Sequence, residues 1–238
     1  MLCSLLKTSL FATALAFPPV ALFPPTARPQ TQATSDWEVF MLKSAQAFAS
    51  QNYGEAEKQA KLALEFSSRF HPEDFRIEKN HRMLGQIYQA ENHFAQAEAA
   101  FQKALSVHHQ RVGSGDDNSP ECLEDLAQLY ELESKYAEAE PLRQRALQMI
   151  GKVYDGKGNW VAERMENLAA VYSAEQKYAA ADELYQKSLE LKEEQYGRDS
   201  TQLAGTLQKK AEVVAHLGRQ SEAAALRDRA SRLLGKRQ

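Results

Sequence analysis

The chain has 238 residues, of which 43% are hydrophobic and 26% charged, and its formal net charge is -3. Only 8 prolines and 11 glycines interrupt it, so it can bury a continuous core. The mildly acidic balance argues against nucleic acid as a partner, because binding to a phosphate backbone needs clustered cations. The composition indicates a soluble and mostly helical protein.

The N-terminal segment, residues 1–33, differs in kind from the rest of the chain. It contains two cations and no acid, and its apolar run over residues 8–23 is broken by Pro18 and Pro19. A membrane-spanning helix needs roughly 20 unbroken apolar residues, so this run is too short and too kinked to be one. The pattern is more typical of a secretory signal peptide.

Two cleavage points fit this segment, one after Ala16 and one after Ala33, and the sequence does not choose between them. Removing residues 1–33 takes away two cations and would change the net charge from -3 to -5. We therefore expect an exported protein, periplasmic or extracellular, without an integral membrane span after cleavage. The alternatives are an uncleaved N-terminal membrane anchor and a disordered tail.

Beyond residue 33 the chain repeats one pair of amphipathic helices at intervals of 41 or 42 residues. In the clearest copy, apolar residues from Met165 to Tyr172 follow one helix face at i, i+3, i+4 and i+7. Two helices cannot enclose such stripes alone, so each pair must stack on the next. The sequence predicts a repeat domain over 34–238, with copies at 36–70, 77–112, 120–153, 160–196 and 201–235.

Two positions of the unit stay in register along the chain. A small residue in the first helix allows close approach of the helix axes, and it recurs as Gly85, Ala127, Ala169 and Ala211. An aromatic residue opens the second helix, as Tyr53, Phe94, Tyr136 and Tyr178. The first and last copies are less regular. In the last one Lys210 replaces leucine and Gln220 replaces the aromatic residue, so we expect this copy to form a polar C-terminal cap.

The residues of the third and fourth copies carry a family resemblance. LEDLAQLY at 123–130 followed by KYAEAEPL at 135–142, and ENLAAVY at 166–172 followed by Lys177 and Tyr178, resemble the tetratricopeptide repeat. The longer period is similar to that of kinesin light chains. The resemblance implies an all-α fold, a right-handed α-α superhelix of about five helical hairpins.

In that family the first helix of each pair lines the concave surface, and its solvent-facing positions bind the ligand. The resemblance therefore implies a groove with a basic end and an acidic middle. Asn167 matches the asparagine that such repeats use to hold a peptide backbone, but Asp125 and Met83 replace it in earlier copies. The matching groove positions are Lys79, Arg82, Gln86, Gln89, Glu121, Glu124, Asp125, Gln128, Glu131, Glu163, Glu166, Asn167, Ser173, Gln208, Lys209 and Glu212.

The sequence offers no set of residues for catalysis, for a cofactor or for a metal ion. The glycine-rich stretch at 113–120 lacks the strand and the lysine that phosphate-binding loops require. His108 and His109 are adjacent on a helix and point about 100° apart, which is a poor arrangement for chelating one metal. Cys122 would be the only cysteine left after signal removal, and it is interpreted as a small, partly buried apolar residue rather than a reactive thiol.

These observations favour a non-enzymatic interaction scaffold that binds a peptide or helix of a partner protein in its concave groove. The acidic groove positions favour a partner with a basic segment. The alternative is a structural, self-associating repeat protein, for which a homo-oligomer is expected. The charged groove positions would otherwise be ordinary solvated helix faces.

Overall fold

The computed structural model describes residues 27–67, 69–112 and 119–235, with side chains from Asp36 onward. Over these ranges the chain forms ten α-helices and one short 3-10 helix, and no strand. The helices are α1 (Ala27–Ala49), α2 (Tyr53–Ser67), α3 (Phe75–Ala90), α4 (Phe94–Val112), α5 (Pro120–Leu132), α6 (Tyr136–Val153), α7 (Asn159–Ala174), α8 (Tyr178–Tyr196), η1 (Thr201–Leu203), α9 (Ala204–His216) and α10 (Gln220–Gly235).

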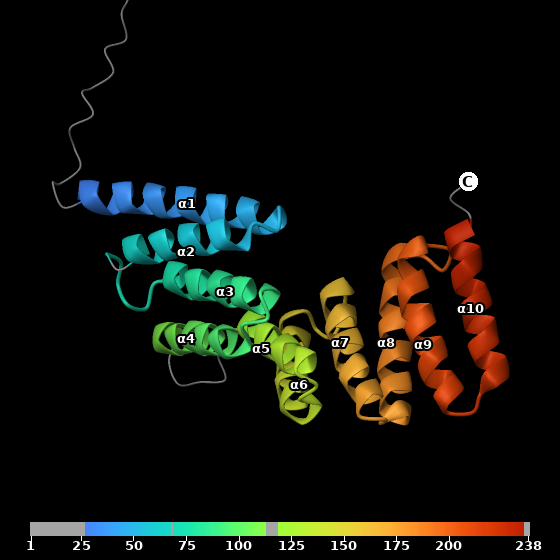
Figure 1. Cartoon of the computed structure of the whole chain (residues 1–238). Coiled ribbons are helices and arrows are strands. Elements are labelled where there is room, and N and C mark those ends of the chain that lie inside the picture. Colours follow the sequence, from blue (N-terminus) through green and yellow to red (C-terminus); the bar gives the residue numbers. More distant parts are fainter. Residues whose placement is uncertain (1–26, 68, 113–118, 236–238) are drawn as a thin grey trace, which may run out of the picture.

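The helices pack as five antiparallel pairs that follow one another in chain order. Figure 1 shows α1 to α4 lying side by side across the view, and α7 to α10 standing upright in it, with α5 and α6 between the two groups. We refer to α1–α4 as the first arm and to α7–α10 as the second arm. This arrangement is the α-solenoid that the repeat predicts.

A left-handed turn joins the two helices of every pair. The turn residue lies two positions before the second helix and has φ between 58° and 78° in Gln51, Asn92, Ser134, Gln176 and Gly218. A backbone hydrogen bond closes each turn, as between the Lys135 N–H and the Tyr130 carbonyl at 2.8 Å. Only the last copy has glycine at this position, so four of these turns accept a strain of about 1 kcal/mol that the tertiary packing must offset.

The small residues in register are buried where the helices pack. Ala127, Ala169 and Ala211 are fully buried. A methyl group at the matching Gly85 would come within 2.4 Å of the Phe101 ring, so the second pair needs glycine where the third, fourth and fifth pairs have alanine. The predicted small-residue position is therefore a close-packing position in the structure, and its size is set by the side chain opposite.

Polar side chains tie each pair to the next. The Tyr88 hydroxyl donates to Glu57 at 2.9 Å, and the Tyr130 hydroxyl donates to Glu98 at 2.7 Å. In the last copy a different pair replaces this tie, because Lys210 forms an ion pair with Asp182. Lys210 is only 4% exposed, so it lies in the interface and not on a polar outer face. The expectation that its substitution helps to cap the solenoid was wrong on this point.

The N-terminal segment is described only from Ala27 onward, so most of the predicted signal peptide lies outside the described residues. The first helix begins at Ala27 and includes Ala33. It starts nine residues before the position 36 that the repeat pattern predicts. None of the described helices has both the length and the apolar character needed to cross a lipid bilayer.

Candidate binding surfaces

The first-helix face is the surface formed by the solvent-facing side chains of α1, α3, α5, α7 and α9. Neighbouring first helices are linked across it by side chains 43 residues apart. The Arg82 guanidinium donates to Asp125 at 2.6 Å between α3 and α5, and the Asn167 amide donates to Glu124 at 2.9 Å between α5 and α7. The same two helix positions thus form a polar link at two successive junctions.

Glu124 has cationic partners in addition to Asn167. Arg143, which extends from α6 and is buried, forms an ion pair with Glu124 and donates to Glu131 at 2.7 Å. The guanidinium of Arg164 lies 3.4 Å from the other oxygen of Glu124. Glu124 and Glu131 of α5 are therefore neutralised by arginines of this chain before any partner arrives.

Glu166 is the most deeply engaged of the predicted groove acids, with only 8% of its surface exposed. It accepts hydrogen bonds from the Lys192 ammonium at 2.5 Å, the Thr206 hydroxyl at 2.5 Å and the Ser188 hydroxyl at 2.8 Å. Burial raises the pKa of its carboxyl, but the bonds from Lys192, Thr206 and Ser188 outweigh burial, and the pKa is lowered. Glu166 of α7 thus forms a buried ion pair with Lys192 of α8 and a hydrogen bond with Thr206 of α9, and these contacts link the three helices.

The predicted groove residues fall into two groups in the structure. Those with a hydrogen-bond or ion-pair partner inside the chain are Arg82, Gln86, Glu121, Glu124, Asp125, Glu131, Glu163, Glu166, Asn167 and Ser173. Within the described ranges, those without such a bond are Lys79, Gln89, Gln128, Gln208, Lys209 and Glu212. Of these, Lys79 lies over the Phe75 ring. Four acids of the expected acidic middle, Glu124, Asp125, Glu131 and Glu166, are therefore in internal ion pairs, which weakens the structural reason for preferring a basic partner.

A pocket of about 310 Å³ opens on the second arm of this face, between α7, α8 and α9. We call it the groove pocket. It brings together three of the predicted residues, which are Ser173, Lys209 and Glu212. Its remaining lining consists of Ala170, Tyr178, Tyr185, Val213 and His216.

Aromatic rings form one wall of the groove pocket. The Tyr178 and His216 rings stack with centroids 4.5 Å apart and an interplanar angle of 1°. Burial, together with the nearby carboxylates of Glu166 and Glu212, raises the pKa of Tyr185 to about 12, so its hydroxyl stays neutral. The pocket therefore has a wall of aromatic rings, and the charged Lys209 and Glu212 stand on exposed parts of its lining.

The groove pocket also includes residues of the second helix and of the end of α9, which the repeat register does not predict. Tyr178 and Tyr185 occupy positions that the apolar pattern assigns to the core, and they are indeed half-buried and buried. His216 lies 38 residues after Tyr178, and this spacing differs from the repeat interval of 41 or 42 residues. The repeat pattern therefore does not predict that the two rings meet. Only the tertiary structure shows that a core stripe also forms a pocket wall.

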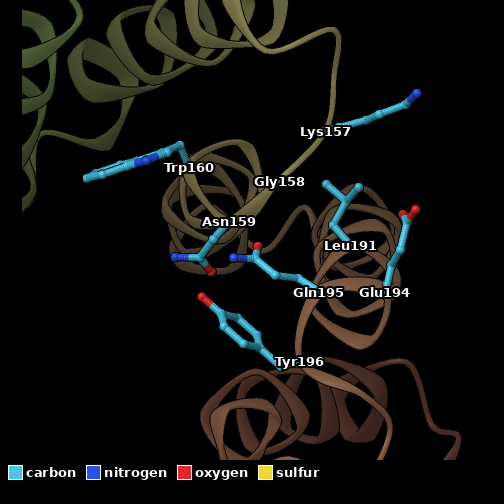
Figure 2. A pocket seen from close by; sticks show the side chains of 8 residues that line it. All are labelled: Lys157, Gly158, Asn159, Trp160, Leu191, Glu194, Gln195 and Tyr196. Carbon is cyan, nitrogen blue, oxygen red and sulfur yellow. The ribbon is translucent and has the colours of Figure 1, made fainter.

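A larger pocket, of about 530 Å³, lies between the start of α7 and the end of α8. We call it the turn pocket, and Figure 2 shows its lining. The side chains of Asn159, Gln195 and Tyr196 point toward one another, and Trp160 projects at the rim. Trp160 is 56% exposed and Tyr196 39% exposed, which is unusual for large aromatic side chains. The sequence analysis did not identify this surface.

The described residues contain no group of three or more histidine, cysteine, aspartate or glutamate side chains that could hold a metal ion. Cys122 is fully buried, and its thiol lies 3.8 Å from Glu78. Burial raises the pKa of the Cys122 thiol to about 12, so the nucleophilic thiolate is disfavoured.

The fold and its surfaces define a helical-repeat protein of the α-solenoid class. The model of a tetratricopeptide repeat family matches residues 75–152, 119–194 and 161–236, which together cover more than half of the chain. The chain therefore belongs to the tetratricopeptide repeat family. No curated protein sequence matches it.

Solved structures resemble the chain in fold. BtubC (BKLC) from P. vanneervenii has a TM-score of 0.74 at 16% identity, over 90% of this chain and 92% of that one. The nearly identical TPR-like repeats of a putative kinesin light chain from Podosopora anserina give 0.72 at 16% identity, over 88% and 98%. A MamA protein gives 0.59 at 17% identity, over 85% and 94%. At such identities the likeness establishes a shared fold, including the kinesin light chain type of repeat.

Proposed function

We propose that this protein is a non-enzymatic interaction module whose first-helix face binds a segment of a partner protein, with the groove pocket as the anchoring point. The observation that carries the proposal is the groove pocket itself, since it combines an aromatic and aliphatic wall with two charged side chains that have no internal partner among the described residues. A concave, mostly apolar pocket with a few polar groups is the usual form of a binding site. The family supports a protein partner in general terms.

The chemistry of the pocket suggests how a partner would bind. An apolar side chain of the partner would enter between Val213 and the stacked Tyr178 and His216 rings. Lys209 and Glu212 lie one turn apart on α9, so they would pair with opposite charges or with backbone groups of the bound segment. The preference comes from one apolar anchor and a balanced pair of charges, and not from an acidic surface.

The experiment is a selection of displayed random peptides on the full chain, followed by affinity measurement. Ala170 is exposed on α7 and lines the groove pocket, so Ala170→Arg would fill the pocket mouth without touching the core. Ala179→Arg, at an exposed position of α8 outside the pocket lining, is the matched control. Selected peptides should lose about tenfold or more in affinity for Ala170→Arg and keep their affinity for the control. Equal binding by both variants would refute the groove pocket as the anchor.

We also propose that the protein is exported through its N-terminal segment. The first helix contains Ala33, so cleavage after Ala16 would leave the described part of this helix intact, whereas cleavage after Ala33 would shorten it. The mass of the mature protein recovered from the host's exported fraction tests this directly. A mass that corresponds to a protein beginning at Phe17 or at Thr34 supports the proposal, and an uncleaved protein that stays with the membrane would contradict it.

A further inference from the structure

The turn pocket is rich in hydrogen-bond donors and has no excess charge. Trp160 carries an indole N–H, Asn159 and Gln195 carry amide groups, and Tyr196 carries a hydroxyl. Lys157 and Glu194 also line the pocket, and their opposite formal charges balance. Asn159 donates to Glu163 at 2.6 Å, which holds its side chain in place. The surface therefore suits a neutral ligand with many acceptors and an apolar side.

Extended proline-rich segments have these properties. A polyproline II helix makes no internal hydrogen bonds, so its carbonyl oxygens remain available as acceptors. Proline rings form its apolar sides, and aromatic-lined grooves with donor side chains bind such segments. The exposed rings of Trp160 and Tyr196, with the amides between them in Figure 2, match this mode of recognition.

The chain itself contains such a segment outside the described residues. Phe-Pro-Pro occurs twice, at residues 17–19 and 23–25, and no charged side chain lies between residues 17 and 26. Proline fixes φ near -65° and biases the preceding residue toward extended geometry, and proline-rich sequences are the ligands of this recognition mode. The neutral character of residues 17–26 also matches the neutral lining.

Helix α1, which follows the segment in the chain, belongs to a different arm from the turn pocket. Figure 1 shows that α1 starts at the outer end of the first arm, whereas α7 and α8 belong to the second arm. The second Phe-Pro-Pro ends at Pro25, two residues before α1, and even an extended chain spans at most about 3.6 Å per residue. A second copy of the chain can provide the segment without this constraint on its reach.

We propose that residues 17–26 of one copy bind the turn pocket of another, so that the protein self-associates head to tail. Such a contact is heterologous, because tail and pocket are different surfaces, and it leads to rings or open chains rather than a simple two-fold dimer. The contact depends on residues 17–26 remaining in the mature protein, as after cleavage at Ala16. It is separate from the groove pocket.

The first experiment is sedimentation velocity of the full chain over a range of concentrations. The wild type should form concentration-dependent oligomers, and Trp160→Ala should weaken this association by about tenfold or more. Tyr154→Ala removes a comparably exposed aromatic side chain outside the pocket lining and serves as the control, which should associate like the wild type. A monomeric wild type, or association that Trp160→Ala leaves unchanged, would overturn the proposal.

The second experiment measures the contact directly. A full-length variant with Pro18, Pro19, Pro24 and Pro25 replaced by serine cannot occupy its neighbours' pockets, so it should be monomeric and should bind a synthetic peptide of residues 17–26. The chain has two tryptophans, of which Trp37 is buried, so the fluorescence change on titration reports Trp160. The expected result is a saturable blue shift that a peptide of scrambled sequence does not produce. No response to either peptide, or a mature protein that begins at Thr34, would refute the proposal.

Discussion

The middle of the first-helix face and its C-terminal end have charged side chains of the same kinds but use them in different ways. In the middle, Asp125 and Glu124 are bound by arginines of this chain, and Glu166 is buried against Lys192. At the end, Lys209 and Glu212 are exposed and have no ion-pair partner among the described residues. A repeat position therefore does not by itself make a side chain a ligand-binding group. What decides its role is whether a neighbouring helix supplies the opposite charge.

The largest expected effect is at Glu166. In Glu166→Ala the Lys192 ammonium loses its carboxylate while only 9% exposed, so unfolding free energy should fall by about 3–5 kcal/mol. Replacing both partners by apolar residues, as Glu166→Leu with Lys192→Met, should recover most of the loss. Chemical denaturation of the three proteins measures this. A loss below about 1 kcal/mol for Glu166→Ala would mean that this acid is a solvated surface group after all.

Acid pH should remove the stability that the buried carboxylates contribute. Because the pKa of Glu166 is lowered in the folded state, its contribution to stability is complete above the unfolded pKa near 4.5 and is lost as pH falls through the folded value. Glu78 follows the same rule. Burial raises its pKa, but the hydrogen bonds from His108 and Arg111 outweigh burial, so the pKa is lowered. Melting temperatures measured from pH 7 to pH 2.5 should fall below about pH 4.5. The fall should be smaller in Glu166→Gln, where one titrating group is absent.

The ion pair between Arg82 of α3 and Asp125 of α5 should contribute less to the unfolding free energy than Glu166 does. Arg82 and Asp125 are partly accessible at their side chains, so a double-mutant cycle with Arg82→Met and Asp125→Ala should give a coupling of about 1–3 kcal/mol. Equilibrium unfolding of the four proteins measures it. If the two single losses add without coupling, the polar link does not hold neighbouring repeats together, and the comparison with the exposed end fails at this junction.

The smallest effect on stability is expected at the exposed end. Glu212→Ala should change the unfolding free energy by less than about 0.5 kcal/mol, because its carboxylate has no partner to lose among the described residues. The same substitution should reduce the affinity of peptides selected on the groove pocket. Parallel measurement of stability and binding separates the two roles. A large loss of stability with unchanged binding would reverse the assignment of structural and ligand-binding positions.

Much of the fold follows from local sequence features. The apolar stripe of period 3.6, the small residue matched at Gly85 and Ala169, and the aromatic residue that opens each second helix predict the helical pairs and their stacking. They do so because the same short pattern is repeated, so each copy supports the interpretation of the others. The left-handed turn at Ser134 or Gln176 is less visible, since residues other than glycine occupy it.

The binding surfaces depended on contacts between residues far apart in the sequence. Sequence reasoning correctly placed Lys209 and Glu212 on an exposed face, but it also placed Glu166 there, because a helix position does not reveal that Lys192 lies opposite. The stacking of Tyr178 on His216, and the convergence of Asn159 with Gln195 and Tyr196, likewise arise only when helices pack. Repeating local patterns determined the architecture from the sequence alone, whereas the pairing of charges and the opening of pockets were decided by the tertiary structure, because burial and partner distance are properties of packed neighbours.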